Sequence, residues 1–177
     1  MHRTIIETSR LRLRELVPDD VEDLHAVLGE PETMRFYPHP LSLQETAEWI
    51  ERSRWRYRTE GHGLWALILK ENGELVGDCG LTVQRVGEAD EVEIGYHVKR
   101  TYWRQGLATE AAVACRDHAF QNLGVARLIC IIRPENIPSQ GVARNIGMLP
   151  EKEVIWAGLP HVIFAIERPE PSPLPDG

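Results

Sequence analysis

Hydrophobic and polar residues alternate in the first part of the chain with the period of a half-buried strand. In residues 9–16, Leu11 and Leu13 alternate with arginines, and a period of two places the leucines on one face of a strand and the arginines on the other. Two helical segments follow, at about residues 18–28 and 43–58, and in the first of them apolar residues recur on one face. We therefore predict one strand followed by two helices.

Both helical segments begin with a residue pair typical of a capping box. Asp19 is followed three residues later by Glu22, and Ser42 is followed by Glu45 at the same spacing. In such a pair the first side chain accepts a hydrogen bond from the helix backbone, and the second reaches back to the N–H of the first residue. We expect a capping box at the start of each helix.

Residues 64–98 have the pattern of three consecutive strands joined by tight turns. Asn72-Gly73 between two apolar runs is the strongest short hairpin signal in the chain. Gly77 and Gly80 lie inside the second run, where a glycine marks either a bulge or a close approach of another backbone segment. The strands are predicted at residues 64–69, 75–86 and 91–98.

The third of these strands carries two carboxylates and an imidazole on one face. Because successive side chains of a strand point to opposite faces, Glu91, Glu93, Gly95 and His97 lie on the same side. The apolar residues between them lie on the other side. The polar face is therefore a candidate for acid–base chemistry.

The remainder of the chain alternates helices and strands and ends in a proline-rich segment. Residues 169–177 carry proline at every second position from 169 to 175, a composition that builds no core, so we expect an extended or disordered tail after a single domain at 1–168. The predicted elements are a helix at 107–123, a strand at 126–132, a helix capped by Ser139 that ends at Gly147, and strands at 153–156 and 161–167 that turn across residues 158–160.

A basic, glycine-containing turn separates the polar strand from the long helix. The first N–H groups of a helix lack intrahelical partners and carry a partial positive charge, so a helix start can bind phosphate. Gly106 allows close approach of the backbone, and Ala108 adds only a methyl group. Lys99, Arg100 and Arg104 add positive charge in a chain whose net charge is -7. This pattern predicts a pyrophosphate site, although Gly-x-Ala at a helix start is also common in simple packing.

These residues resemble the acetyl-coenzyme A motif of the GNAT N-acetyltransferase superfamily, in particular its RimJ/RimL branch of ribosomal-protein N-terminal acetyltransferases. The resemblance rests on residues 93–96 and 102–111, and it extends from about residue 8 to residue 166. Trp103 stands where the superfamily's phosphate loop usually begins with Arg or Gln. The resemblance implies the GNAT fold, an α+β fold with a central mixed, mostly antiparallel sheet flanked by helices, and acetyl-CoA as co-substrate. It also implies these cofactor-binding residues: His97, Val98, Arg104, Gln105, Gly106, Leu107, Ala108, Thr109, Asn136 and Ser139.

A second match to this branch lies further along the chain. Asn136 and Ser139 have the spacing of its Asn-x-x-Ser motif, followed by a helix that ends at Gly147, with Met148 in place of the usual Phe. By resemblance, Asn136 hydrogen-bonds the pantetheine arm and Ser139 lies near the sulfur. Many superfamily members have a tyrosine seven residues after this Asn that protonates the thiolate, but this chain has Ala143. Ser139 is then the candidate acid.

The chemistry of acetyl transfer to an amine requires a base. An alkyl ammonium group has a pKa of about 10.4, so the amine must lose a proton before it attacks. Glu93 is the first candidate, with Glu91 and His97 as alternatives on the same face. The backbone N–H of His97 or Val98 is expected to stabilise the oxyanion. The thiolate has a pKa of about 8.5 and can leave without an acid, so a hydroxyl from Ser139, or Tyr102 in reserve, is optional.

Three classes of function are compatible with a phosphate-binding turn. The first is an acetyl-CoA-dependent N-acetyltransferase acting on an amine of a small molecule or a protein N-terminus. The second is a non-catalytic acyl-CoA-binding or regulatory protein that has kept the cofactor site. The third, a nucleotide enzyme, is disfavoured because neither Gly-x-Gly-x-x-Gly nor Gly-x-x-x-x-Gly-Lys occurs. We favour the first.

The acceptor is the part of the reaction that the sequence leaves open. By resemblance the helical hairpin in this part of the chain overhangs the acceptor site, so the loop at residues 36–39, Phe-Tyr-Pro-His, is a candidate for substrate selection. Packing of aromatic side chains against the sheet explains the same pattern, and for Trp49 and Trp55 we favour that interpretation. A homodimer also remains open.

Composition narrows the class of protein. With 177 residues and 42% hydrophobic content, the chain can bury one sizeable core, and its acidic balance disfavours nucleic acid as a partner. The three cysteines lack metal-ligand spacing and an even count, so we expect reduced core thiols, no metal site and a cytoplasmic location. No apolar run reaches the length of a membrane span, so no membrane partner is expected.

Overall fold

The computed structural model describes residues 3–170, and its centre is an eight-stranded sheet. The strands are β1 (Thr4–Glu7), β2 (Leu11–Glu15), β3 (Leu64–Leu69), β4 (Leu75–Val86), β5 (Ala89–Val98), β6 (Arg127–Ile132), β7 (Leu149–Trp156) and β8 (Leu159–Glu167). The helices are α1 (Val21–Leu28), α2 (Leu43–Thr59), α3 (Leu107–Gln121) and α4 (Ile137–Asn145), with short 3-10 turns η1 (Pro18–Asp20) and η2 (Arg100–Tyr102). The order across the sheet is β1-β2-β3-β4-β5-β6-β8-β7, and only β5 and β6 are parallel. The predicted α+β fold with a mostly antiparallel sheet is confirmed.

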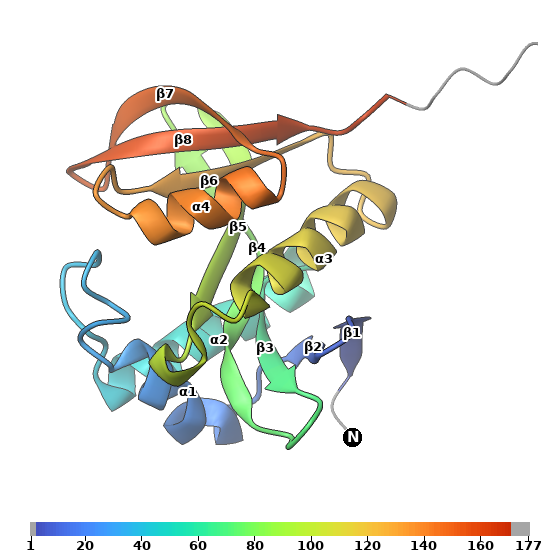
Figure 1. Cartoon of the computed structure of the whole chain (residues 1–177), viewed down its shortest axis with the longest axis vertical. Coiled ribbons are helices and arrows are strands. Elements are labelled where there is room, and N and C mark those ends of the chain that lie inside the picture. The colour runs from blue at the N-terminus through green and yellow to red at the C-terminus, as the bar shows by residue number, and fades with distance from the viewer. Residues whose placement is uncertain (1–2, 171–177) are drawn as a thin grey trace, which may run out of the picture.

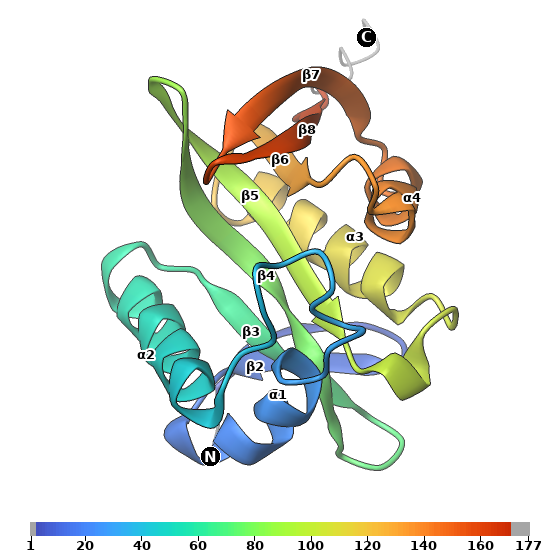
Figure 2. The same ribbon diagram turned by 90° about the vertical axis from the view of Figure 1, so that its left-hand side faces the viewer.

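Helices cover both faces of the sheet. In Figures 1 and 2, α3 and α4 lie on one face, whereas α1, α2 and the loop between them lie on the other. Strand β3 shows the consequence, because all six of its residues are buried. Trp65 and Leu67 belong to the core on the α3 side, while Ala66 and Ile68 belong to the core on the α1–α2 side. A strand buried on both faces has an unbroken apolar sequence rather than an alternating one.

Strands β5 and β6 part soon after they meet. Their only paired residues are Glu93 and Ile129, although β5 continues to Val98 and β6 to Ile132. In Figure 1, β5 runs between the half of the sheet made of β1–β4 and the half made of β6–β8. The backbone groups on this edge of β5 therefore face a gap between two strands instead of a neighbouring strand.

Two glycines of β4 allow close contact between backbone segments, as their positions in the sequence suggested. A Cβ atom on Gly77 would lie 1.9 Å from the carbonyl oxygen of His97, and one on Gly80 would lie 2.0 Å from that of Gly63. Real Cβ atoms do not come so close to another heavy atom, so a side chain at either position would push the strands apart. These glycines fix β4 tightly between its neighbours β3 and β5.

The N-terminal part differs from the sequence prediction in two ways. Strand β1 was missed, and it pairs with β2 at the edge of the sheet. The predicted capping box of Asp19 and Glu22 is wrong: residues 18–20 form η1, and α1 begins at Val21 without a side-chain cap. The physical reason is Asp20, whose carboxylate accepts the Val17 N–H at 2.9 Å and is ion-paired with Arg14 at 2.7 Å.

The other local predictions agree with the structure more closely. The capping box of Ser42 and Glu45 is confirmed at the start of α2. Strands β7 and β8 are longer than predicted, because the turn between them uses Ala157 and Gly158, both with positive φ, and leaves Pro160 inside β8. Of the predicted tail, residues 171–177 lie outside the described residues, and 169 and 170 belong to no helix or strand.

Two further predictions concern the cysteines and the length of the helices. Cys79, Cys115 and Cys130 are buried and free, which confirms them as core thiols. None of the helices in residues 3–170 is long and apolar enough to cross a membrane.

Candidate active site

The predicted phosphate turn places free N–H groups at the start of α3. Gly106 is the N-cap residue and has φ 78°, a left-handed conformation that favours glycine. Within residues 3–170 no group accepts a hydrogen bond from the N–H of Leu107, Ala108 or Thr109. Three unpaired donors at the positive end of a helix form a site suited to an anion.

The turn is held in place by Arg10 of the β1–β2 connection. Its Nε donates to Glu110 Oε2 at 2.6 Å, and its Nη1 donates to the carbonyl oxygen of Gln105 at 2.8 Å. Glu110 also accepts a hydrogen bond from the Thr8 hydroxyl at 2.6 Å. The sequence pattern placed Arg10 on the strand face opposite the leucines but gave no partner for it, because its partners lie about a hundred residues away along the chain.

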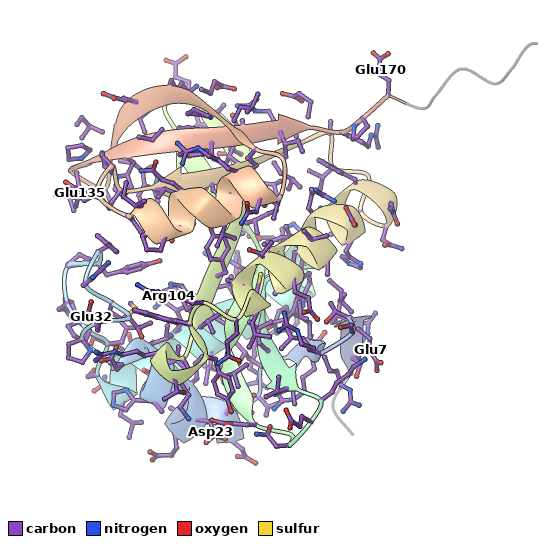
Figure 3. All side chains as sticks on the ribbon, in the orientation of Figure 1. Glu7, Asp23, Glu32, Arg104, Glu135 and Glu170 are labelled. Atoms are coloured by element: carbon purple, nitrogen blue, oxygen red, sulfur yellow. The ribbon has the colours of Figure 1, made fainter. Side chains whose placement is uncertain are left out.

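Of the three cations predicted around the turn, two are already paired. Lys99 lies 2.6 Å from Glu74, and Arg100 lies 3.5 Å from Glu30. No acidic group in the described part of the chain pairs with Arg104, whose backbone has φ 61°. Figure 3 shows the Arg104 side chain extending toward the side of the molecule where Glu32 is labelled. Arg104 is therefore the cation available to a phosphate group at the turn.

The backbone N–H and C=O groups of the even-numbered residues of β5 point toward the gap between β5 and β6. The Lys99 N–H donates to the Val76 carbonyl oxygen at 2.7 Å, on the β4 side. Because neighbouring residues of a strand direct their backbone groups to opposite edges, Val98 faces the gap and His97 faces β4. The Val98 carbonyl accepts the indole N–H of Trp103 at 2.7 Å. Trp103 thus anchors the phosphate turn to the end of β5, and of the two predicted oxyanion donors the Val98 N–H is the better placed.

Glu93 is held on the α1–α2 face of β5 by polar side chains of β4. Its Oε2 accepts hydrogen bonds from Gln84 Nε2 at 2.9 Å and from Thr82 Oγ1 at 3.3 Å. Burial raises the pKa of Glu93, while the hydrogen bonds from these side chains and from the Ile131 backbone lower it by less. A carboxylate with a raised pKa is a stronger proton acceptor than an exposed one.

Glu91, the first alternative base, is part of an ion-pair cluster. Arg127 of β6 lies 3.2 Å from Glu91, 2.8 Å from Glu151 and 2.8 Å from Glu167. These acids raise the pKa of Arg127 further above its ordinary value. The geometry makes Glu91 a structural partner of Arg127.

His97, the second alternative, lies in the middle of a buried polar chain. Its Nδ1 is 2.7 Å from Asp78 Oδ1, and its Nε2 is 2.7 Å from the hydroxyl of Tyr37. Asp78 is fully buried and also accepts the indole N–H of Trp49 at 2.8 Å. Both ring nitrogens of His97 are therefore engaged. Burial, followed by the charges of Glu93 and Asp78, raises the pKa of Tyr37.

This polar chain determines the role of the aromatic residues in the first half of the sequence. Tyr37, from the loop predicted to select the substrate, reaches β5 through His97. Trp49 packs edge-on against the same imidazole, with ring centroids 5.6 Å apart. Trp55 is 53% exposed, so its predicted packing against the sheet is wrong. The loop reaches the sheet through the contact of Tyr37 with His97 rather than through a row of aromatic rings.

The second predicted motif lies at the start of α4. Asn136, not Ser139, is the helix cap, because its side-chain oxygen accepts the Ser139 N–H at 3.2 Å. The backbone carbonyl of Ser139 accepts the hydroxyl of Tyr96 at 2.8 Å, which joins α4 to β5. Ala143 is fully buried in the core. Tyr102, the reserve acid, donates instead to Glu74 at 2.5 Å.

A cavity of about 390 Å³ opens beside Tyr37. Its walls come from the loop after α1, from the segment between β6 and α4, and from the start of β8, and they include Phe36, Pro38, Arg133 and Leu159. A volume of this size suits a small molecule. In the described residues no group of three or more His, Cys, Asp or Glu side chains is arranged to hold a metal ion.

Comparisons with known proteins identify one family. Residues 10–149 match the family described as the acetyltransferase (GNAT) domain. YkkB of Bacillus subtilis (strain 168), described as uncharacterized, is 35% identical over 166 residues, which cover 92% of this chain and 95% of that protein.

Solved structures have the same fold. The crystal structure of an acetyltransferase from Agrobacterium tumefaciens (strain C58) has a TM-score of 0.81 and 25% identity, and covers 94% of this chain and 97% of that one. RimL, a ribosomal L7/L12 α-N-protein acetyltransferase solved in complex with coenzyme A, has a TM-score of 0.74 and 17% identity, over 93% of this chain and 98% of that one.

The buried chain around Asp78 gives a test of stability. Asn in place of Asp78 has one acceptor oxygen, so either Trp49 loses its acceptor, or His97 must change tautomer and its bond with Tyr37 must reverse direction. We expect Asp78→Asn to lower the free energy of unfolding by about 1–3 kcal/mol, measured by urea denaturation. Asp90→Asn, which removes an exposed ion pair with Arg85, is the control and should change it by less than about 0.5 kcal/mol. Equal midpoints for the two variants would contradict the role of Asp78.

Proposed function

The chain belongs to the GNAT acetyltransferase family, and on this premise we propose that it is an acetyl-CoA-dependent N-acetyltransferase. It transfers the acetyl group directly to a primary amine while both substrates are bound. The observation that carries this proposal is the parting of β5 and β6 after the Glu93–Ile129 pair. One gap then connects the free N–H groups of α3, the unpaired edge of β5 and a carboxylate with a raised pKa.

The residues along the gap fit acetyl-CoA. The N–H groups of Gly106 to Thr109 suit the pyrophosphate, with Arg104 and the side chain of Gln105 at the exposed rim of the turn. Oδ1 of Asn136 caps α4, and its amide N–H₂ has no acceptor among residues 3–170, which suits the amide-rich pantetheine arm. The coenzyme A complex of the RimL neighbour supports the same use of the fold. When bound, acetyl-CoA supplies an acetyl group activated as a thioester.

Glu93 acts as the general base, directly or through a water molecule. Its carboxylate lies on the face of β5 that bears Tyr37 and the cavity, and burial raises its pKa. Glu91 is held by Arg127, and His97 has both nitrogens engaged. Both alternatives are held by structural partners, which favours Glu93 as the base.

The remaining groups stabilise charge that develops during transfer. The Val98 N–H donates to the carbonyl oxygen of the acetyl group as it becomes negative. The Ser139 hydroxyl is the proton donor for the departing thiolate. Because a thiolate is a good leaving group at neutral pH, this donor contributes less to the rate than Glu93 does.

The acceptor is an amine of a small molecule or of a protein N-terminus. The RimL neighbour acts on a ribosomal protein, which favours a protein N-terminus as the acceptor. The cavity beside Tyr37, in contrast, has the volume of a small-molecule site. We also propose a single domain at residues 1–168 and a cytoplasmic location. The free buried thiols support the location.

A non-catalytic acyl-CoA-binding protein is the alternative. It is favoured by Ala143, which stands where many family members have a catalytic tyrosine. The two functions are separated by thiol release from acetyl-CoA in the presence of amines. Coenzyme A binding without thiol release on any amine would support the alternative.

A test of the cofactor site uses two glycines in the same backbone conformation. Gly106 has φ 78° and Gly124 has φ 67°, so replacing either with Glu costs similar backbone strain. Only Gly106→Glu brings a negative side chain to the phosphate site. We expect it to raise the Kd for acetyl-CoA at least tenfold, which corresponds to about 1.4 kcal/mol, in calorimetric titration. Gly124→Glu should keep the wild-type Kd, and an unchanged Kd for Gly106→Glu would show that the phosphates bind elsewhere.

A test of the base compares Glu93→Gln with Glu91→Gln on the same strand face. Glu93→Gln should lower kcat/KM about 10²-fold near neutral pH, with the deficit shrinking as pH approaches the pKa of the amine. A base must be ionised, and burial raises the pKa of Glu93 above 4.5, so the wild-type rate should begin to fall on acidification at a pH above 4.5. Glu93→Gln should lack this acidic limb, and Glu91→Gln should retain it. Equal rates for wild type and Glu93→Gln across pH would place the base elsewhere.

A further inference from the structure

Arg133 is the side chain of the cavity that lacks a satisfactory partner. It follows β6, lines the cavity, and has a side-chain exposure of 21%. Its Nε is buried and has no hydrogen-bond partner among residues 3–170. Its Nη2 lies 3.4 Å from Glu135, a long contact to a carboxylate that is 63% exposed. A guanidinium group withdrawn from water with an unpaired N–H is unfavourable unless a ligand supplies the acceptor.

Arg35, the other cation on the cavity wall, is already paired. Arg35 lies 2.6 Å from Glu32 and stacks over the ring of Phe36, 4.6 Å from its centroid. Glu135 is the acidic residue of the wall, and in Figure 3 it is labelled on the same side of the molecule as Glu32. The rest of the wall is largely apolar. The buried edge of Arg133 is thus the polar feature of the cavity that remains to be matched.

The distance from Arg133 to the proposed base limits the size of the ligand. The Ile131 backbone N–H lies close enough to the carboxylate of Glu93 to lower its pKa, and Arg133 follows two residues later. Two residues of extended chain span about 7 Å. An amine at Glu93 and an anion at Arg133 would therefore be separated by only a few bonds.

We propose that Arg133 binds a carboxylate of the acceptor, so that the acceptor is a small amino acid with its carboxylate close to the amine that is acetylated. The inference rests on the proposed acetyltransferase function and names its substrate class. Nε and Nη2 of a guanidinium can donate in parallel to the two oxygens of a carboxylate. Glu135 occupies part of this edge at long range and gives way to the substrate.

The test uses pairs of ligands that differ in the carboxylate alone. L-leucine, L-methionine, L-phenylalanine and γ-aminobutyrate are compared with their carboxamides, for equilibrium binding to the coenzyme A-saturated protein and for acetylation. We expect the carboxylate of the best pair to bind and react at least about tenfold better than its carboxamide, on the order of 1.4 kcal/mol. Arg133→Gln should abolish this preference through KM rather than kcat, while Arg133→Lys should retain part of it.

Glu135→Gln is the matched variant, and its effect on the KM of the amino acid should be opposite to that of Arg133→Gln. Removing the competing carboxylate should lower the KM of the amino acid and leave that of the carboxamide unchanged. Wild-type protein that binds both members of every pair equally would overturn the proposal, as would acetylation of amidated N-terminal peptides that is unaffected by Arg133→Gln. Selective binding of an amino acid without acetylation would support the carboxylate site and overturn the enzyme, so the two failures are distinguishable.

Discussion

The parting of β5 and β6 is the constraint on which the rest of the site depends. Opening two adjacent strands inside a sheet leaves backbone groups without ladder partners, and buried backbone groups need partners. The chain supplies some of them from side chains: Trp103 donates to the Val98 carbonyl at 2.7 Å, and the Cys130 thiol donates to the Ile94 carbonyl at 3.2 Å. The Val98 N–H faces the gap and is the group we assign to the substrate. The position of α3, whose first N–H groups are also unpaired, extends the same opening to a site suited to phosphate.

On the α1–α2 face of the sheet, the polar side chains form two groups. One holds the loop after α1 in place, and the other includes the proposed base, Glu93. Asp78, His97 and Tyr37 form a continuous chain, and Trp49 completes the hydrogen bonding of Asp78. This chain binds the loop after α1 to β5 and gives the cavity one of its walls. Glu93 lies on the same strand face but takes its hydrogen bonds from β4. Asp78 and Glu93, both on this face, thus have different tasks because different neighbours hold them.

Features set by local sequence were predictable, whereas features set by distant contacts were not. The hairpin at Asn72-Gly73, the capping box at Ser42 and the close approach at Gly77 follow from short-range chemistry, and all are present. The order of elements and the turn before α3 led to the correct fold. Strand β1, the clamp of Arg10 on Glu110, the anchor from Trp103 and the bond from Tyr96 to Ser139 were missed. The contacts of Arg10 with Glu110 and of Tyr96 with Ser139 join segments 100 and 43 residues apart, whose proximity follows only from the assembled sheet. Strand β1 and the Trp103 anchor are local features that the sequence pattern did not indicate. The buried N–H of Arg133 became apparent only with the cavity around it.

The measurement that tests the central claim most directly is a titration of ¹⁵N-labelled protein with coenzyme A, followed by the backbone amide resonances. We expect the largest and saturable shifts at residues 106–109, with smaller shifts at Val98 and near Asn136 and none along β1 or β7. Hydrogen bonds from these N–H groups to the ligand would produce this pattern. Saturable shifts confined to another surface, or no shifts at millimolar coenzyme A, would contradict the assignment of the gap between β5 and β6 as the cofactor site.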